Sequence, residues 1–287
     1  MNEPREGLIL LNKPTGVTSF QALRPVKQLL PRKTKVGHTG TLDQFATGLL
    51  PVLAGKATRL VRIFSSFDKS YRGVIRLGEE SDTLDPESEA RTVGAPPDRE
   101  TLERAVSTFL GTIRQIPPAY SAVHIDGERA YRRVMRGETV EIPSREVTIY
   151  SFDLIAYDPP DATVEVHCSK GTYVRALARD LAASCGTGAY LRSLSRTTVG
   201  PYTLAEAEQE VTENAFQTLE EIVERLPNIR SVVVTPVVAQ RVANGAKLRP
   251  LIGAEEWAGA DPYVAIRRDD GTVVAVADSD FRYVLVR

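Results

Sequence analysis

Residues 35–51 read KVGHTGTLDQFATGLLP and say more about this chain than any other segment. They hold one carboxylate, Asp43, and one histidine, His38, among three glycines. Asp43 is the only acidic residue between Glu6 and Asp68, a region in which Lys and Arg are common. A carboxylate next to cationic side chains is expected to stay ionised at neutral pH. Such a group suits a nucleophile or a general base.

A second interpretation of Asp43 is structural. Asp is a favoured N-cap residue, and residues 44–50 could form the helix that it would cap. Spacing alone does not separate a helix cap from a catalytic carboxylate.

The composition is that of a globular protein of 287 residues, with 42% hydrophobic and 25% charged residues. This length allows one large domain and one small domain. No apolar run approaches the roughly 18 residues that cross a membrane, and the polar N-terminus does not resemble a signal peptide. Cys168 and Cys185 form no Cys-x-x-Cys pair, and three scattered histidines have no metal-ligand spacing. We therefore expect a cytoplasmic protein without a metal.

The net charge of −1 hides an asymmetry along the chain. Residues 1–75 contain twelve Lys and Arg against four Asp and Glu, whereas residues 201–230 contain seven Glu against two Arg. The basic end could contact a phosphate backbone. It could equally be an ordinary solvated surface.

Hydrophobic periodicity predicts a mixture of strands and helices. Strands are expected at residues 7–11, 71–77, 147–157 and 163–168. Helices are expected after Ser19, after Asp98, over residues 172–184 and over residues 215–226. Beyond residue 228, a short helix ending at Gly245 and strands at residues 263–267, 273–277 and 281–286 suit a small β-barrel.

A different pattern occupies residues 113–146. A proline-stiffened stretch, residues 115–122, leads into an expected basic helix over residues 128–136. This helix could be an ordinary exposed helix or part of an arm that closes on RNA.

The Asp43 segment resembles the catalytic loop of the TruB family, the bacterial tRNA pseudouridine-55 synthases, whose pattern is G-H-x-G-x-L-D-P-x-A-T-G-L-L-P. Gln44 departs from it, because the family usually has proline there. Residues 7–18, residues 69–78 (K-x-Y-x-x-x-x-x-L-G) and residues 168–181 match further family motifs in order, and residues 190–194 add a shorter one. The resemblance covers roughly residues 7–200.

The resemblance implies an α+β protein with the pseudouridine synthase fold, a mixed and mostly antiparallel sheet flanked by helices. The catalytic domain is expected over residues 1–228, with an RNA-binding arm at about residues 113–146. Residues 229–287 are placed like the small PUA-like RNA-binding β-barrel of the family.

The resemblance also implies roles for single residues. Asp43 becomes the catalytic carboxylate, and Arg175 the arginine that pairs with it. Tyr71 stacks on the target base, with its hydroxyl near the C5 proton that must leave. His38 inserts into the T loop and takes the space that the flipped base vacates.

The remaining expected substrate-binding residues are Lys13 beneath the active site, Tyr173 and Leu191 in the pocket, and Arg132, Arg133 and Arg136 in the arm. His124 departs from the family, which commonly has lysine after P-P-x-Y-S-A.

The implied reaction converts uridine 55 of the tRNA T loop to pseudouridine by base flipping, glycosidic bond cleavage and reattachment through C5. Asp43 attacks the ribose or removes a sugar proton, and the sequence leaves both routes open. No cofactor, metal, membrane or guide RNA is expected, and the protein is expected to be a monomer.

Three rival functions fit parts of the same pattern. A guide-RNA-dependent rRNA pseudouridine synthase would use the same chemistry, and an RNA-binding tRNA-folding chaperone would have an inactive pocket. A sugar hydrolase normally needs a second carboxylate across the scissile bond, and no second acid stands in the matched motifs.

Overall fold

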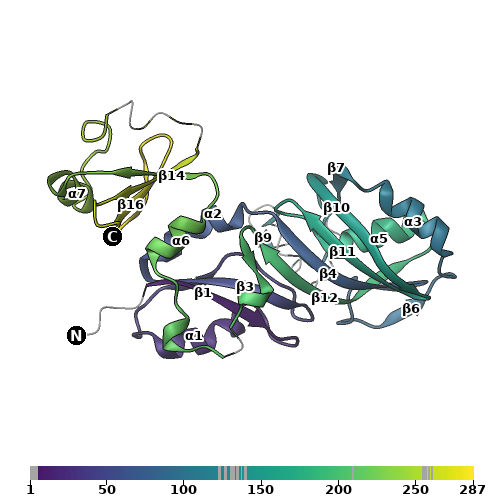
Figure 1. Ribbon diagram of the computed structural model, residues 1–287. Coiled ribbons are helices and arrows are strands. Elements are labelled where there is room, and N and C mark those ends of the chain that lie inside the picture. Colours follow the sequence, from purple (N-terminus) through teal and green to yellow (C-terminus); the bar gives the residue numbers. More distant parts are fainter. Residues whose placement is uncertain are drawn as a thin grey trace.

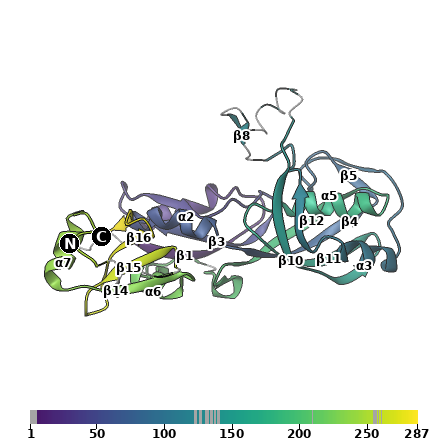
Figure 2. The ribbon, with the colours of Figure 1, turned by 90° about the horizontal axis from the view of Figure 1, so that it is seen from above.

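The computed structural model describes residues 6–121, 124–125, 128–129, 133, 136, 138, 141–208, 210–253, 257, 259 and 261–287. The molecule is elongated, with a large sheet that spans most of its length and a smaller sheet at one end (Figures 1 and 2). Within the described residues this is a mixed α and β architecture, as the sequence predicts.

A nine-stranded sheet forms the body of the molecule, in the order β1-β3-β12-β4-β11-β10-β7, with β2 on β3 and β13 on β12. All its pairs are antiparallel except β12 with β3. The strands are β1 (Gly7–Lys13), β2 (Val36–His38), β3 (Thr47–Ala54), β4 (Lys69–Leu77), β7 (Gly111–Gln115), β10 (Arg145–Asp158), β11 (Asp161–Cys168), β12 (Ala189–Val199) and β13 (Tyr202–Thr203). The expected mostly antiparallel sheet is thus confirmed.

Helices cover the sheet unevenly. The helices are α1 (Arg24–Leu29), α2 (Val61–Ser65), α3 (Arg99–Ser107), α5 (Val174–Ser184), α6 (Leu219–Arg225) and α7 (Pro236–Ala243), with short 3-10 turns η1 (Gln21–Leu23), η2 (Gly55–Leu60), η3 (Leu204–Glu206) and η4 (Glu213–Ala215). Figure 1 shows α3 and α5 at the end of the sheet away from the C-terminus. Their apolar faces share one core cluster with β4, β11 and β12.

Strand β1 is buried on both faces. Leu8 and Leu10 pack into one apolar cluster, while Ile9 and Leu11 pack into another on the opposite face, with α1. A continuous apolar run is expected of a strand that is covered on both sides.

The segment after Asp43 is a strand and not a helix. Residues 47–54 form β3, which pairs with β1 and leaves no helix for Asp43 to cap. Position 48 in this strand requires glycine, since its φ is +104° and a Cβ would lie 2.4 Å from the Arg196 carbonyl oxygen. The N-cap interpretation of Asp43 is therefore wrong.

The expected helix after Ser19 begins later. A 3-10 turn, Gln21–Leu23, precedes α1, and Pro25 lies in the first turn of α1, where its missing N–H costs nothing. The helix expected after Asp98 is confirmed as α3. Asp98 is its N-cap, and the Asp98 carboxylate accepts a hydrogen bond from the Thr101 N–H at 2.7 Å.

The arm differs from its prediction. Residues 128–129 form β9 (Glu128–Arg129), which pairs with β8 (His124–Ile125) as a short hairpin, so the expected helix does not begin at residue 128. Figure 2 shows this hairpin standing away from the sheet. A separate two-stranded antiparallel sheet is formed by β5 (Glu79–Ser81) and β6 (Ala90–Thr92).

The C-terminal sheet contains β14 (Ile229–Val233), β15 (Tyr263–Arg267), β16 (Val273–Asp278) and β17 (Tyr283–Val286), in that order. Its edge strands β14 and β17 do not pair with each other, so the described strands form an open sheet and not a closed barrel. One face packs with α7 and Trp257. The other face shares an apolar cluster with β1, β3, η2, α2 and α6 of the large sheet.

Candidate active site

The Asp43 loop is held from behind by buried polar groups. Ser19 Oγ donates to the Leu42 carbonyl at 3.0 Å and accepts from the Leu42 N–H at 2.8 Å. On the other side, Lys13 Nζ donates to the Gln44 carbonyl at 3.3 Å. The residues before and after Asp43 are therefore both anchored.

Lys13 belongs to this support. Its side chain is buried, and Nζ also donates to the carbonyls of Pro14 at 2.9 Å and Val17 at 2.7 Å. Burial lowers the pKa of Lys13 to about 8, partly opposed by the charge of Asp43. Lys13 thus lies beneath the Asp43 loop, with its Nζ facing protein carbonyls.

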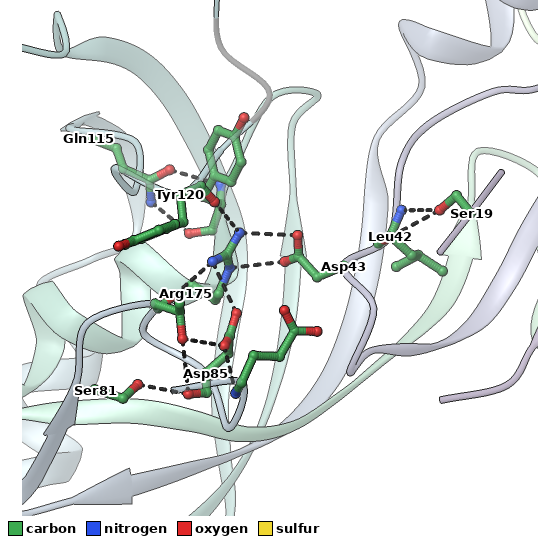
Figure 3. Close-up of polar contacts among 11 residues, drawn as sticks. Ser19, Leu42, Asp43, Ser81, Asp85, Gln115, Tyr120 and Arg175 are labelled. Carbon is green, nitrogen blue, oxygen red and sulfur yellow. Dashed lines mark hydrogen bonds and ion pairs between the residues drawn. The ribbon is translucent and has the colours of Figure 1, made fainter. Parts of the chain in front are cut away.

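Arg175, in the first turn of α5, is the centre of the site (Figure 3). Its Nε lies 2.9 Å from Asp43 Oδ2, and Nη2 donates to Asp43 Oδ1 at 3.0 Å. Nη1 donates to Asp85 Oδ2 at 3.1 Å and to the Thr83 carbonyl at 2.7 Å. Nη2 also donates to the Tyr120 carbonyl at 3.0 Å. The expected pairing of Arg175 with Asp43 is present.

The two carboxylates on Arg175 differ in exposure. The Asp43 side chain is 34% exposed, whereas the Asp85 side chain is 3% exposed and Arg175 is 4% exposed. Asp85 and Arg175 are therefore sealed inside the protein, and Asp43 is the group of the three that an incoming molecule can reach.

The environment makes Asp43 easier to protonate than a free aspartate. Burial raises the pKa of Asp43, the charge of Asp85 raises it further, and Arg175 opposes both. The sequence suggested only the opposing cation, because burial is not visible from local charge.

Tyr71 and Arg196 form a second buried pair. Tyr71 lies in β4 and hydrogen-bonds with the Arg196 side chain. Arg196 Nε donates to the Leu49 carbonyl at 2.8 Å, and Nη2 donates to the Gly40 carbonyl at 3.1 Å. Arg196 thus ties the Tyr71 hydroxyl to the Asp43 loop.

A cavity of about 330 Å³ opens between these groups. Its described lining consists of Thr39, Gly40, Thr41, Leu42, Asp43, Ser65, Lys69, Tyr71, Ser121, Arg145, Gly171, Thr172, Tyr173, Val174, Leu194 and Arg196. Asp43, Tyr71 and Tyr173 are therefore brought together from three distant segments. Leu191 is fully buried in the core and contributes nothing to this lining, whereas Leu194 does.

His38 stands apart from this lining. It ends β2 and is half-buried, and its Nδ1 has no hydrogen-bond partner in the described structure. Burial and the nearby charge of Arg196 lower the pKa of its imidazole.

The arm residues are only partly described. Arg133 and Arg136 each pair with Glu138, at 2.8 Å and 2.9 Å. Arg132 and the side chain of His124 lie outside the described residues.

Sequence reasoning missed Asp85, Arg196 and Arg145. Asp85 lies in residues 81–86 (SDTLDP), shortly after the motif at residues 69–78. The available signal was that this short turn contains a second acid besides Asp82. Arg196 lies two residues after the motif at residues 190–194, and Arg145 lies two residues before the strand expected at residues 147–157, so neither carried a local signal.

No group of three His, Cys, Asp or Glu side chains among the described residues is arranged to hold a metal ion. No described helix is both long enough and apolar enough to span a membrane.

Known proteins resemble this chain in sequence and in fold. The model of the TruB family pseudouridylate synthase N-terminal domain matches residues 27–174. The chain belongs to the TruB family. It is 38% identical over 256 residues to tRNA pseudouridine synthase B of Borreliella burgdorferi, covering 88% of this chain and 89% of that protein. It is 37% identical over 287 residues to the enzyme of that name from Thermobifida fusca, covering 96% and 94%.

A third relative is more similar in sequence, but over a shorter part of both chains. The tRNA pseudouridine synthase B of Pseudomonas aeruginosa is 45% identical over 206 residues, which cover 70% of this chain and 66% of that protein. Among solved structures, a Cbf5-Nop10-Gar1 complex matches with a TM-score of 0.67 and 25% identity, covering 95% of this chain and 78% of that one. This likeness confirms the pseudouridine synthase fold.

Proposed function

We propose that this TruB family protein isomerises uridine 55 in the T loop of tRNA to pseudouridine. The observation that carries the proposal is the partly exposed Asp43 carboxylate, held by buried Arg175 in a cavity that also contains Tyr71. The tRNA pseudouridine synthase B relatives support tRNA as the substrate.

The reaction breaks the bond between C1′ and N1 of the nucleoside and forms a bond between C1′ and C5. The proton on C5 leaves and N1 gains one, so atoms balance without an added reagent. Asp43 is the carboxylate that acts on the ribose, either as nucleophile or as base. Arg175 fixes both oxygens of Asp43 and so orients it toward the cavity.

Tyr71 supplies the surface on which the uracil stacks and the hydroxyl next to its C5 proton. The hydrogen bond from Arg196 holds that hydroxyl in place. A phenol with a partner already in position needs no reorganisation when the proton leaves.

The uridine reaches the cavity only after it leaves the base stack, which costs a few kcal/mol. His38 fills the vacated space in the T loop, and Tyr173 lines the pocket that receives the base. The arm residues Arg132, Arg133 and Arg136 contact RNA phosphates. Residues 229–287 act as a PUA-like module that binds tRNA beyond the T loop, next to a catalytic domain of residues 1–228.

The protein acts as a monomer in the cytoplasm, without guide RNA, metal or cofactor. The structural likeness to a Cbf5 complex is the observation that favours the rival, a guide-RNA-dependent synthase. An RNA-binding chaperone with an inactive pocket is the other rival, and the Asp43–Arg175 pair speaks against it.

The test is to incubate the purified protein with an unmodified tRNA transcript, with no guide RNA or cofactor, and to map pseudouridine by chemical sequencing. A signal at position 55 alone is expected. Modification that appears only with a guide RNA would favour the first rival, and tRNA binding without any modification would favour the second.

A further inference from the structure

Three side chains that line the cavity carry polar atoms without a hydrogen-bond partner in the described part of the chain. They are Thr39 through Oγ1, Ser121 through Oγ, and Arg145 through Nε and Nη2. Thr39 is 2% exposed and Ser121 is 5% exposed, so both hydroxyls belong to buried side chains. Native proteins leave few buried polar groups unsatisfied. Three around one cavity indicate a polar ligand that completes their hydrogen bonds.

Arg145 differs from the other two arginines of the site. Arg175 holds two carboxylates, and Arg196 donates to backbone carbonyls and to Tyr71. Arg145 has no carboxylate within ion-pair distance among the residues described. It is therefore a cation of the cavity whose charge the described protein does not balance.

The Arg145 guanidinium is nevertheless held in place. Its central carbon lies 4.5 Å from the centre of the Tyr173 ring, the geometry of a cation–π contact. The backbone of Tyr173 is fixed by buried Gln115, which accepts from its N–H at 2.8 Å and donates to its carbonyl at 3.1 Å. Gln115 in β7 is the register partner of Arg145 in β10. One strand pair thus positions both the ring and the guanidinium.

We propose that Arg145 binds a phosphodiester group next to the flipped uridine, while the Thr39 and Ser121 hydroxyls bind polar atoms of the same nucleotide. The inference rests on the proposed function, because that nucleotide is its substrate. A guanidinium presents its N–H groups at the edge of its plane, so the face can rest on Tyr173 while the edge binds two phosphate oxygens. The unbalanced charge of Arg145 is matched by the single charge of the phosphodiester.

The first experiment measures the dissociation constant of tRNA and the single-turnover rate for Arg145→Gln. The matched control is Arg72→Gln, an exposed arginine of β4 that pairs with Glu165 at 3.1 Å and does not line the cavity. Arg145→Gln is expected to weaken tRNA binding by about 10- to 100-fold, the size of a lost hydrogen bond to a charged group. Arg72→Gln is expected to stay within about twofold of wild type. Wild-type affinity in Arg145→Gln would overturn the proposal.

The second experiment alters the RNA and leaves the protein intact, so it does not depend on the folding of a variant. A T-stem-loop receives a neutral methylphosphonate in place of the phosphate on the 5′ or the 3′ side of the target uridine. One of the two substitutions is expected to weaken wild-type binding by the same factor as Arg145→Gln, and to add nothing further in that variant. Full affinity of wild type for both modified RNAs would overturn the proposal, as would losses that multiply in the variant.

The same assays separate this inference from the proposed function. A wild-type protein that forms no pseudouridine in unmodified tRNA overturns the proposed function itself. Pseudouridine formation by wild type, together with unchanged binding by Arg145→Gln, overturns the phosphate subsite alone.

Discussion

The cavity around Asp43 and the junction between the two sheets are built by opposite means. Beside the cavity, Asp43, Asp85 and Arg175 meet as buried or half-buried charges. At the junction, apolar side chains of both sheets, such as Leu8 and Leu285, share one cluster. A buried ion pair loses about as much in desolvation as it gains in attraction, so it fixes geometry more than it adds stability. Apolar burial stabilises the fold without specifying chemistry. Changes in the first region should therefore affect turnover, and changes in the second should affect folding.

The largest effect is expected from Asp43→Asn, which keeps the shape of the side chain and removes its charge. Turnover on tRNA should fall by about a thousandfold or more, within the range of a lost catalytic acid or base. The dissociation constant of tRNA should hardly change. Single-turnover assays and filter binding measure the two quantities, and residual activity within about tenfold of wild type would contradict the assignment of Asp43.

Leu285→Ala tests the other region. Leu285 is fully buried in the shared cluster, so its truncation should lower the free energy of unfolding by about 3 kcal/mol. Turnover at a temperature where the variant is folded should match wild type. The matched control is Val237→Ala, because Val237 is 72% exposed on α7.

Thermal unfolding and turnover are measured together on both variants. A large loss of kcat in folded Leu285→Ala would show that the junction also positions the cavity. It would contradict the expectation that the junction affects folding alone.

Asp85→Asn probes how the cavity tunes Asp43. The charge of Asp85 raises the pKa of Asp43, so its removal should lower that pKa. In the proposed reaction ionised Asp43 is the active form, so the acid limb of the kcat/KM profile should move to lower pH. Turnover at neutral pH should fall by about tenfold, since Arg175 loses one of its buried anchors.

The control for Asp85→Asn is Asp82→Asn, an exposed acid close in sequence that pairs with Arg91. Its pH profile should overlay that of wild type. An acid limb of Asp85→Asn that stays in place or moves to higher pH would mean that Asp85 does not act on Asp43 through charge.

The smallest effect is expected in the arm. Glu138 pairs with Arg133 and Arg136, and Glu138→Gln should strengthen tRNA binding by about two- to threefold at low salt. Neutralising Arg132, Arg133 and Arg136 together should flatten the salt dependence of binding by about two to three units, at roughly 0.7 to 0.9 per phosphate contact. The control for Glu138→Gln is Glu141→Gln, since Glu141 is an exposed acid near the end of the arm. An unchanged salt slope would show that these arginines do not contact RNA.

Most regular elements were predictable from the sequence, because their apolar patterns are local. The strands at residues 71–77 and 163–168 and the helix at residues 172–184 agree with β4, β11 and α5 within a few residues. The error at residues 44–50 has a tertiary cause. That segment pairs with β1 and approaches β12 at Gly48, and neither partner is visible in the local pattern.

The pocket residue in β12 shows the same limit on a smaller scale. The motif drew attention to Leu191, but the structure buries Leu191 in the core and brings Leu194 to the cavity. The pairing of β12 with β4 shifts its register between Leu191 and Ser193. A bulge of this kind changes which side chains face which side of a sheet, and alternation cannot predict it.

The sequence by itself determined which reactive groups this protein carries and in which motifs they stand. Asp43, Tyr71 and Arg175 could be named from their segments, because a motif is read within a few residues. Only the tertiary structure decided how these groups behave. Asp85 meets Arg175 across 90 positions of the chain, Arg196 reaches Tyr71, and burial raises the pKa of Asp43. The physical reason is that electrostatic energy depends on distance in space and on exclusion of water, which sequence separation does not reveal.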